Sequence, residues 1–438
     1  MLTSEKVLGS LLVLAAVLTS SVAVASPRPH LSEPMLSSYS SAKIIQQNDA
    51  ASSLTGLHVF VQAGLDRQTP AQSGIAALVA ECVLRSAPSP RAGSLRSYAA
   101  AQGGSISYDV DGQYVRFYVE ATTSNFRAAV SALEAVLRHP DLDAQTVNDA
   151  RIFLNQKATE SEKIPLTVGL EILNAALSTD TDAGLPQYGS PATLAGITSA
   201  DAQAFYRAFY RRDSAVISAV GSLAGLRAED FSGVADALPP GSSRPVNVKI
   251  GALGGNSHRV LARRDIGVPW IVAGFPAPSP QSRDFGAMLL LASVVDNMLE
   301  NKGVTTRPMS ERSFGALYNF DQRPANFVIY ANGATGDPSK TLATVFSVLT
   351  VFSHSPLNKE ALEKTKSIAS GSFANSAVTL EDRSWLAANF VSQGLRPDYL
   401  KRALQAIAKT SAADVQRVGT RYLQNPTLAY VLPRDTNR

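Results

Sequence analysis

The chain has 438 residues, of which 45% are hydrophobic and 17% charged, so it can bury a large core and form two or more domains. Its 40 basic and 36 acidic residues give a formal charge of +4 without the Lys/Arg runs that mark a nucleic-acid-binding surface. Nucleic acid is therefore not an expected partner. Because Cys82 is the single cysteine, an intrachain disulfide is excluded, and stability has to come from the core.

The first 25 residues have the features of an export signal. Lys6 precedes a long apolar run, and Ala23-Val24-Ala25 matches the small-x-small pattern of a cleavage site. We expect a signal peptide over 1–25, cleavage after it, and a periplasmic or secreted protein with no stable membrane insertion. The alternative is an uncleaved N-terminal anchor, because this apolar run approaches the length that spans a bilayer.

Beyond the signal, the two halves of the chain show the same order of expected elements. The strand pattern "LHVFVQAG" precedes one helical pattern, and "WIVAGF" from Trp270 precedes another, "FGAMLLLASVVDNML". The stretch "SISYDVDGQYVRFYVEA" predicts two strands joined by a turn at Asp111-Gly112, and "ANFVIYANG" from Ala325 occupies the matching place. Each half therefore begins with a strand and a helix and continues with further strands.

Later helices repeat as well. "PDLDAQTVNDARIFL" matches "SPLNKEALEKTKSIA", with Asp143 and Asn358 as expected N-caps at an offset of 215 residues. "TSADAQAFYRAFY" matches "SAADVQRVGTRYL" at an offset of 213, and both stretches begin with a Thr/Ser-x-x-Asp capping box. The alternative is that this common order of elements recurs without any duplication, but the nearly constant offset argues against it.

The repeat predicts an α+β fold with two homologous domains in tandem, each an antiparallel-rich sheet packed by helices. The N-terminal domain is expected over 36–237 and the C-terminal domain over 249–438. The Pro/Gly/Ser-rich stretch 238–248 is the expected linker between them.

The stretch "SGIAALVAEC", residues 73–82, predicts a helix capped by Ser73 with one apolar packing face. Ala77, Ala80 and Glu81 stand at i, i+3 and i+4, so their side chains share a second patch. A helix can place two metal ligands and a carboxylate at this spacing, but here the patch holds two methyl groups and one carboxylate. We expect the alanines to form a cavity wall and Glu81 to be solvated or hydrogen-bonded.

The segment "LHVFVQAGLDRQTPAQSGIAALVAECVL" resembles the first strand and zinc helix of the pitrilysin/insulinase metallopeptidases, which include the mitochondrial processing peptidases. Active members carry a Gly-x-Ala-His-x-x-Glu-His motif. In this chain the first histidine falls on Ala77, the glutamate on Ala80 and the second histidine on Glu81, and the third ligand falls on or near Gln156. The resemblance implies half of a clam-shaped peptidase that has no catalytic or metal-binding residues and no cofactor of its own.

Other catalytic sites find no support in the sequence. A catalytic zinc needs about three protein ligands and an open water position, but the five histidines are at least 28 residues apart. The Gly-x-Ser-x-Gly, Gly-x-x-x-x-Gly-Lys and Gly-x-Gly-x-x-Gly motifs are absent. Cys82 lies on the apolar helix face, where a thiol usually behaves as a small hydrophobe.

In the second half, the resemblance offers two candidate substrate-binding residues. Active relatives carry an Arg-Glu-x-x-Gly-Leu-Ala-Tyr segment whose Arg and Tyr contact substrate. The corresponding "SERSFGALYNF" keeps Tyr318, but Glu311 stands at the arginine position and Arg312 follows it. The candidates are Tyr318 and Arg312. The alternative for Tyr318 is a tyrosine packed against the sheet at the start of a strand.

Three functions are compatible with these patterns. The first is an exported non-catalytic subunit that pairs with an active zinc-peptidase relative and helps it to bind or process peptides; zinc is then expected only in that partner. The second is a stand-alone peptide-binding or scaffold protein, comparable to the inactive core subunits of the respiratory bc complex. The third is an enzyme that uses unexpected residues.

Overall fold

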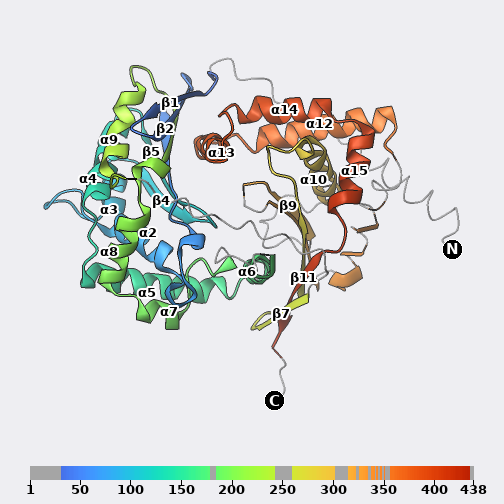
Figure 1. Cartoon of the computed structure of the whole chain (residues 1–438), viewed down its shortest axis with the longest axis horizontal. Helices are drawn as coiled ribbons and strands as arrows, with labels where there is room; N and C mark the ends of the chain where they lie inside the picture. The colour runs from blue at the N-terminus through green and yellow to red at the C-terminus, as the bar shows by residue number, and fades with distance from the viewer. Residues whose placement is uncertain are drawn as a thin grey trace.

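The computed structural model describes residues 31–177, 184–241, 259–300, 314–321, 325–333, 337–340 and 356–434, with short pieces between 342 and 350. The expected signal peptide and residues 242–248 of the expected linker lie outside the described residues, so both remain predictions. Two sheets organise the described residues (Figure 1). The first has the strand order β1-β2-β6-β3-β5-β4 and comprises β1 (Met35–Tyr39), β2 (Ala42–Asn48), β3 (Leu54–Val61), β4 (Ser105–Val110), β5 (Val115–Thr122) and β6 (Val216–Gly221).

The second sheet repeats this topology. Its order is β7-β11-β8-β10-β9, built from β7 (Arg259–Arg264), β8 (Trp270–Pro276), β9 (Phe314–Asn319), β10 (Asn326–Asn332) and β11 (Thr427–Pro433). Apart from the additional strand β1, the two sheets match strand for strand. In each, one pair is parallel, β2 with β6 and β7 with β11, and the remaining matched neighbours are antiparallel. The predicted α+β fold with two homologous domains is confirmed.

Helices cover the sheets of both domains. The first half contributes α2 (Ile75–Arg85), α3 (Leu95–Ala101), α4 (Phe126–Arg138), α5 (Ala144–Ser161), α6 (Pro165–Leu177), α7 (Pro191–Gly196), α8 (Ser199–Phe209) and α9 (Ser232–Ala237). The second half contributes α10 (Phe285–Glu300), α12 (Lys359–Asn375), α13 (Leu380–Ser392), α14 (Tyr399–Lys409) and α15 (Ala412–Tyr422). Across the described stretches, none of these helices combines the length and hydropathy that crossing a membrane requires.

The predicted N-caps of the later helices are confirmed. Asp143 accepts a hydrogen bond from the Thr146 backbone N–H at 2.7 Å, and Asn358 accepts one from that of Ala361 at 2.8 Å. The capping boxes that begin α8 and α15 are also present. Such caps are local interactions within one helical turn, which is why the sequence pattern predicts them well.

The predicted cap of α2 is wrong. The N-cap is Gly74 rather than Ser73, and its φ of +97° lies in the left-handed region that favours glycine. The side chain of Gln68 performs the capping, because its Oε1 accepts hydrogen bonds from the backbone N–H groups of Gly74 and Ala76 at 3.0 and 3.2 Å. A residue in the preceding loop therefore satisfies the orphan donors of the helix.

Each domain contributes one helix that packs on the sheet of the other domain. Helix α6 of the first half packs on the second sheet, where Gly169 lies against Val272. Helix α13 of the second half packs on β3 and β6 of the first sheet. The starts of α6 and α13, Pro165 and Leu380, differ by the same 215 residues as the two N-caps. In Figure 1 both helices lie between the sheets, so the domain interface is built from the duplicated element itself.

Polar contacts fix α13 against the first sheet. Arg383 Nη1 lies 2.8 Å from Asp49 Oδ2, and the two side chains are only 4% and 6% exposed. His58 Nδ1 lies 2.6 Å from Ser384 Oγ, and both residues are buried. Burial, reinforced by the positive charge of Arg116, lowers the pKa of His58 to about 3. His58 is therefore a neutral imidazole at physiological pH.

Folding stability is expected to depend on His58 in acid. Because an unfolded histidine takes up a proton near pH 6.5 and folded His58 does so near pH 3, its contribution is complete above about 6.5 and declines as the pH falls toward 3. Within that window the loss is about 1.4 kcal/mol per pH unit. The variant His58→Asn keeps a hydrogen-bonding side chain but cannot titrate. Urea unfolding between about pH 7 and pH 4.5 should give a shallower pH dependence for the variant, and parallel curves would contradict the assignment.

Candidate functional site

Helix α2 lies inside the first domain. Every residue from Ile75 to Leu84 is buried, and Ala77, Ala80 and Glu81 are each 0% exposed. Helices α3, α5 and α8 and strand β4 all contact it. The expectation that the alanines form a cavity wall is wrong, because helical periodicity identifies a face but not what packs on that face.

The Glu81 carboxylate is bound by two arginines. Arg96 donates from Nη1 to Oε1 at 3.2 Å and from Nη2 to Oε2 at 3.0 Å, which is a bidentate pair. Arg85 Nε lies 2.8 Å from Glu81 Oε1. The Glu81 side chain is 0% exposed, whereas those of Arg85 and Arg96 are 31% and 45% exposed. The buried negative charge is thus compensated by cations that retain contact with solvent, which reduces the cost of burying the pair.

Helix α5 completes this Glu81 cluster with an aromatic ring. The guanidinium carbons of Arg85 and Arg96 lie 5.6 and 5.9 Å from the centre of the Phe153 ring, and Lys157 Nζ lies 5.7 Å from it. These are cation–π distances. Gln156, the residue predicted at or near the third-ligand position, is exposed and donates to Glu160 Oε1. The structure therefore brings Phe153, and not Gln156, to Glu81 and its arginines.

The Glu81 cluster does not suit a metal ion. Arg85 and Arg96 already pair with the Glu81 carboxylate and would repel a divalent cation, while Lys157, the third cation beside the Phe153 ring, pairs with Glu160. Throughout the part of the chain that the structure describes, no group of three or more His, Cys, Asp or Glu side chains could hold a metal. The described residues at the motif positions therefore do not form the ligand set that the resemblance implies for active relatives.

The neighbouring titratable groups are held neutral. Burial raises the pKa of the Cys82 thiol to about 12, and the Glu81 charge contributes to the shift. Burial raises the pKa of Tyr108 well above its usual value, again with a contribution from Glu81. A buried, protonated thiol is a poor nucleophile, which agrees with the reading of Cys82 as a packing residue.

Tyr318 has a packing environment. Its hydroxyl donates to the Pro278 carbonyl, and its ring centre lies 6.1 Å from that of Phe285 and 5.6 Å from that of Phe320. Burial raises its pKa well above the usual value, so the phenol stays protonated. Arg312, the second predicted substrate-binding residue, lies outside the described residues. Among the described contacts, none joins Tyr318 to the Glu81 cluster.

The sequence contained only part of the signal for this cluster. Arg85 follows Glu81 at i+4, the spacing of a helical ion pair, and could have been proposed as its partner. Arg96 and Phe153 lie on other helices at distances in sequence that follow no local pattern. Only the packing of α3 and α5 against α2 reveals them.

Two family models match this chain. The model described as Insulinase (Peptidase family M16) matches residues 43–189, and the model described as Peptidase M16 inactive domain matches residues 196–369. Together they cover well over half of the sequence. The chain belongs to peptidase family M16. The resemblance inferred from the helix over 73–82 and its degenerate motif is confirmed.

Solved structures agree with the M16 assignment at the level of the fold. A protease from Helicobacter pylori superposes with a TM-score of 0.76 at 13% identity and covers 92% of this chain and 100% of that one. The peptidase M16 inactive domain from Pseudomonas fluorescens gives a TM-score of 0.76 at 14% identity, with 92% and 99% coverage. Among curated proteins, subunit 1 of the mitochondrial cytochrome b-c1 complex of Caenorhabditis elegans is 22% identical over 178 residues, 41% of this chain and 37% of that protein's length.

Proposed function

We propose that this chain is an exported, non-catalytic M16 subunit that partners an active zinc peptidase of the same family in binding or processing peptides. The observation that carries this proposal is the Glu81 cluster. A bidentate Arg96 pair occupies the helix face on which active relatives carry their zinc ligands, and Ala77 and Ala80 close that face with methyl groups. The residues at these motif positions thus do not include the ligands and the base that peptide hydrolysis on zinc needs.

The packing around α2 explains how the fold persists without a metal. Structural metal sites can supply much of a small domain's folding free energy, but here α2 is buried from Ile75 to Leu84 within one continuous apolar core. A subunit of this kind can keep its fold without a zinc site. It can then form one wall of the catalytic chamber of an active partner. Similarity to an inactive M16 domain and to a subunit of a larger complex supports a partner role.

Co-expression with an M16 zinc peptidase from the same genome tests the pairing. The expected result is a co-purifying heterodimer with higher peptidase activity than the catalytic chain alone. The control replaces the catalytic glutamate of the partner, which should abolish activity while leaving the complex intact. If the chain elutes as a monomer and leaves the activity of every such peptidase unchanged, the pairing is refuted.

The second candidate function is a stand-alone peptide-binding or scaffold protein. It is favoured specifically by the similarity to subunit 1 of the cytochrome b-c1 complex, a protein named for its assembly and not for a reaction. Purification of the tagged chain from its own organism distinguishes the two functions. Recovery with an intact M16 peptidase supports the first, and recovery within an assembly that contains no peptidase supports the second.

Export is part of the proposed function and has its own test. The pattern Ala23-Val24-Ala25 after an apolar run motivates cleavage near residue 25. The intact mass of the protein recovered from the periplasm or medium should lack about 25 N-terminal residues. Retention of Met1 in a membrane fraction would instead identify an uncleaved anchor.

A further inference from the structure

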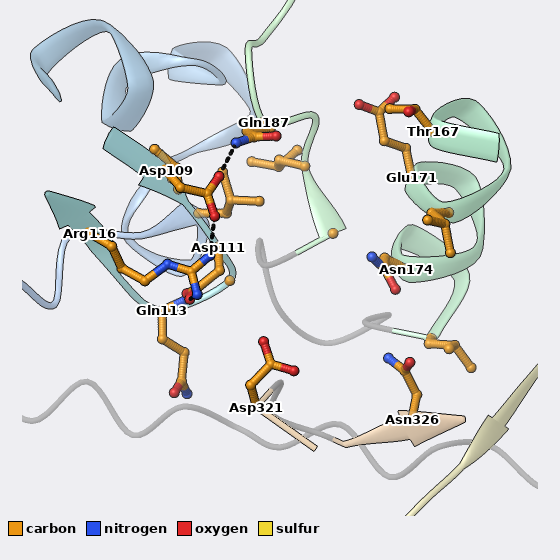
Figure 2. A pocket seen from close by; sticks show the side chains of 17 residues that line it. Asp109, Asp111, Gln113, Arg116, Thr167, Glu171, Asn174, Gln187, Asp321 and Asn326 are labelled. Atoms are coloured by element: carbon orange, nitrogen blue, oxygen red, sulfur yellow. Dashed lines mark hydrogen bonds and ion pairs between the residues drawn. The ribbon is translucent and has the colours of Figure 1, made fainter. Parts of the chain in front are cut away.

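Two of the cavities among the described residues differ in how their charged side chains are paired. In the cavity between the domains, Asp109 pairs with Arg116 and Gln187 within the lining itself (Figure 2). The other cavity lies in the second domain, where the residues that precede α10 meet α14 and the start of α15, and its volume is about 410 Å³. We call it the basic cavity, because its lining includes Arg283, Arg402 and Lys409.

Close packing fixes the walls of the basic cavity. The first turn of α10 lies against the end of α14, and a Cβ on Gly286 would stand only 2.3 Å from the Ala406 carbonyl oxygen. Figure 1 shows α10, α14 and α15 grouped together in the second domain. The Pro280 carbonyl oxygen accepts hydrogen bonds from Arg402 Nε and Nη2 at 3.2 and 3.1 Å. Arg402 is therefore held in place, while its Nη1 makes no hydrogen bond to a described residue.

The carboxylates at the basic cavity already have partners. Asp414 lines the cavity, and its Oδ1 accepts from Arg417 Nη2 at 2.9 Å while its Oδ2 accepts from Ser411 Oγ at 2.6 Å. Asp284, which is adjacent in sequence to the lining and 1% exposed, accepts from Arg417 Nη1 at 2.5 Å and from the Tyr422 hydroxyl at 3.0 Å. Both carboxylates are thus engaged by Arg417 and by hydroxyl groups.

The three basic lining residues are left without a close counter-ion. Arg283 is 77% exposed and reaches Asp284 only at 3.7 Å. Among the described residues, neither Arg402 nor Lys409 has an ion-pair partner. Like charges gathered around one space repel each other, and an anion placed between them removes that cost. The unpaired cations therefore point to an anionic ligand.

The number of these cations selects the kind of anion. Two or three positive charges match a dianion better than a monovalent carboxylate, and the planar guanidinium of Arg402 suits the geometry of phosphate oxygens. The exposed Gln405 amide is a further donor in the lining. A volume of about 410 Å³ lies within the range of small-molecule sites, so an organic group has room beside the phosphate.

We propose that the basic cavity binds a phosphate monoester. Arg402 Nη1 and Lys409 would contact the phosphate oxygens, and Arg283 would approach them from the exposed rim. The organic part of the ester would lie along Ala406 and the aliphatic stems of Arg402 and Lys409. This site belongs to the second domain and does not include the Glu81 cluster, so it adds a ligand to the function proposed above.

Calorimetric titration of the purified chain with glycerol 3-phosphate at physiological salt tests the proposal. One site per chain is expected, and acetate should bind at least about tenfold more weakly. Lys409→Gln and Arg402→Gln should each weaken the binding of glycerol 3-phosphate by roughly tenfold or more. Lys401→Gln is the matched control and should leave binding unchanged, because Lys401 is an exposed lysine of the same helix that does not line the cavity.

Vesicles that contain phosphatidic acid identify the source of the phosphate monoester. Co-sedimentation of the chain with these vesicles, abolished by Lys409→Gln, would assign a lipid headgroup to the basic cavity. Binding of glycerol 3-phosphate without co-sedimentation would assign a soluble ester.

Two results would overturn the proposal. One is that neither glycerol 3-phosphate nor the vesicles bind to a chain whose folding is verified by circular dichroism. The other is binding that Lys409→Gln and Arg402→Gln both leave unchanged, that Lys401→Gln weakens equally, or that acetate reproduces with equal affinity, since each indicates attraction to net charge alone. Because Lys409 is exposed, Lys409→Gln keeps the test decisive even if loss of the Pro280 contact unfolds Arg402→Gln.

Discussion

The triple variant Ala77→His, Ala80→Glu and Glu81→His is expected to lose roughly 4–6 kcal/mol of folding stability and to gain no zinc site. These are the substitutions that would restore the helix motif of active M16 members. Ala77 and Ala80 are completely buried, so each larger side chain overpacks the core at a cost of about 1–3 kcal/mol. The carboxyl group introduced by Ala80→Glu would also be buried without a designed partner, and Arg85 and Arg96 would lose theirs.

Urea unfolding and elemental analysis measure the two parts of this prediction. The substitution Ala100→His is a suitable control, because Ala100 is exposed on α3 and its replacement should change stability little. Glu81→Gln separates loss of the carboxylate charge from overpacking, since glutamine has nearly the same shape. A soluble triple variant with the stability of the natural chain and one bound zinc would contradict the account of the core around α2.

Replacing Arg383 with alanine is expected to destabilise the fold by about 3–5 kcal/mol, because the buried Asp49 carboxylate would remain without its partner. The two side chains join α13 of the second half to the first sheet, and both are at most 6% exposed. The control Arg127→Ala breaks a pair in which the arginine is 68% exposed, and it should cost no more than about 1 kcal/mol.

A double-mutant cycle with Asp49→Ala identifies the cause of the Arg383 effect. If an unpaired buried charge is responsible, the double variant should be more stable than the sum of the single losses implies. Chemical unfolding of all four proteins gives the coupling free energy. Additive losses, or equal effects of Arg383→Ala and Arg127→Ala, would show that the interface does not depend on this pair.

Much of the fold could be predicted because its signals are local. The strand patterns, the caps at Asp143 and Asn358, and the constant offset all act within one element or repeat it, and the structure confirms the strands, the caps and the repeated topology. The exchange of α6 and α13 could not be predicted, since it depends on contacts between residues hundreds of positions apart. The cap of α2 was missed for a related reason, because Gln68 acts from a loop outside the helical pattern.

The sequence predicted the candidate site only through the absence of the family's ligand residues at the motif positions. The motif comparison placed Ala77, Ala80 and Glu81 on one helix face, and the structure places all three in the core. What replaces the metal chemistry, the pairing of Glu81 with Arg96 beside Phe153, arises from the packing of three helices and has no spacing rule in the sequence. Resemblance to the family thus identified which motif positions differ, and only the packing showed which contacts the residues at these positions make.

The zinc content of the purified mature chain tests the central claim most directly. Elemental analysis should show no stoichiometric zinc after incubation with excess metal and gel filtration, because Glu81 supplies the one carboxylate at the motif positions and Arg85 and Arg96 already pair with it. An intact M16 peptidase treated in the same way is the positive control. Close to one zinc per chain, lost in Glu81→Ala, would contradict the claim that this helix face has exchanged metal binding for an ion-pair cluster.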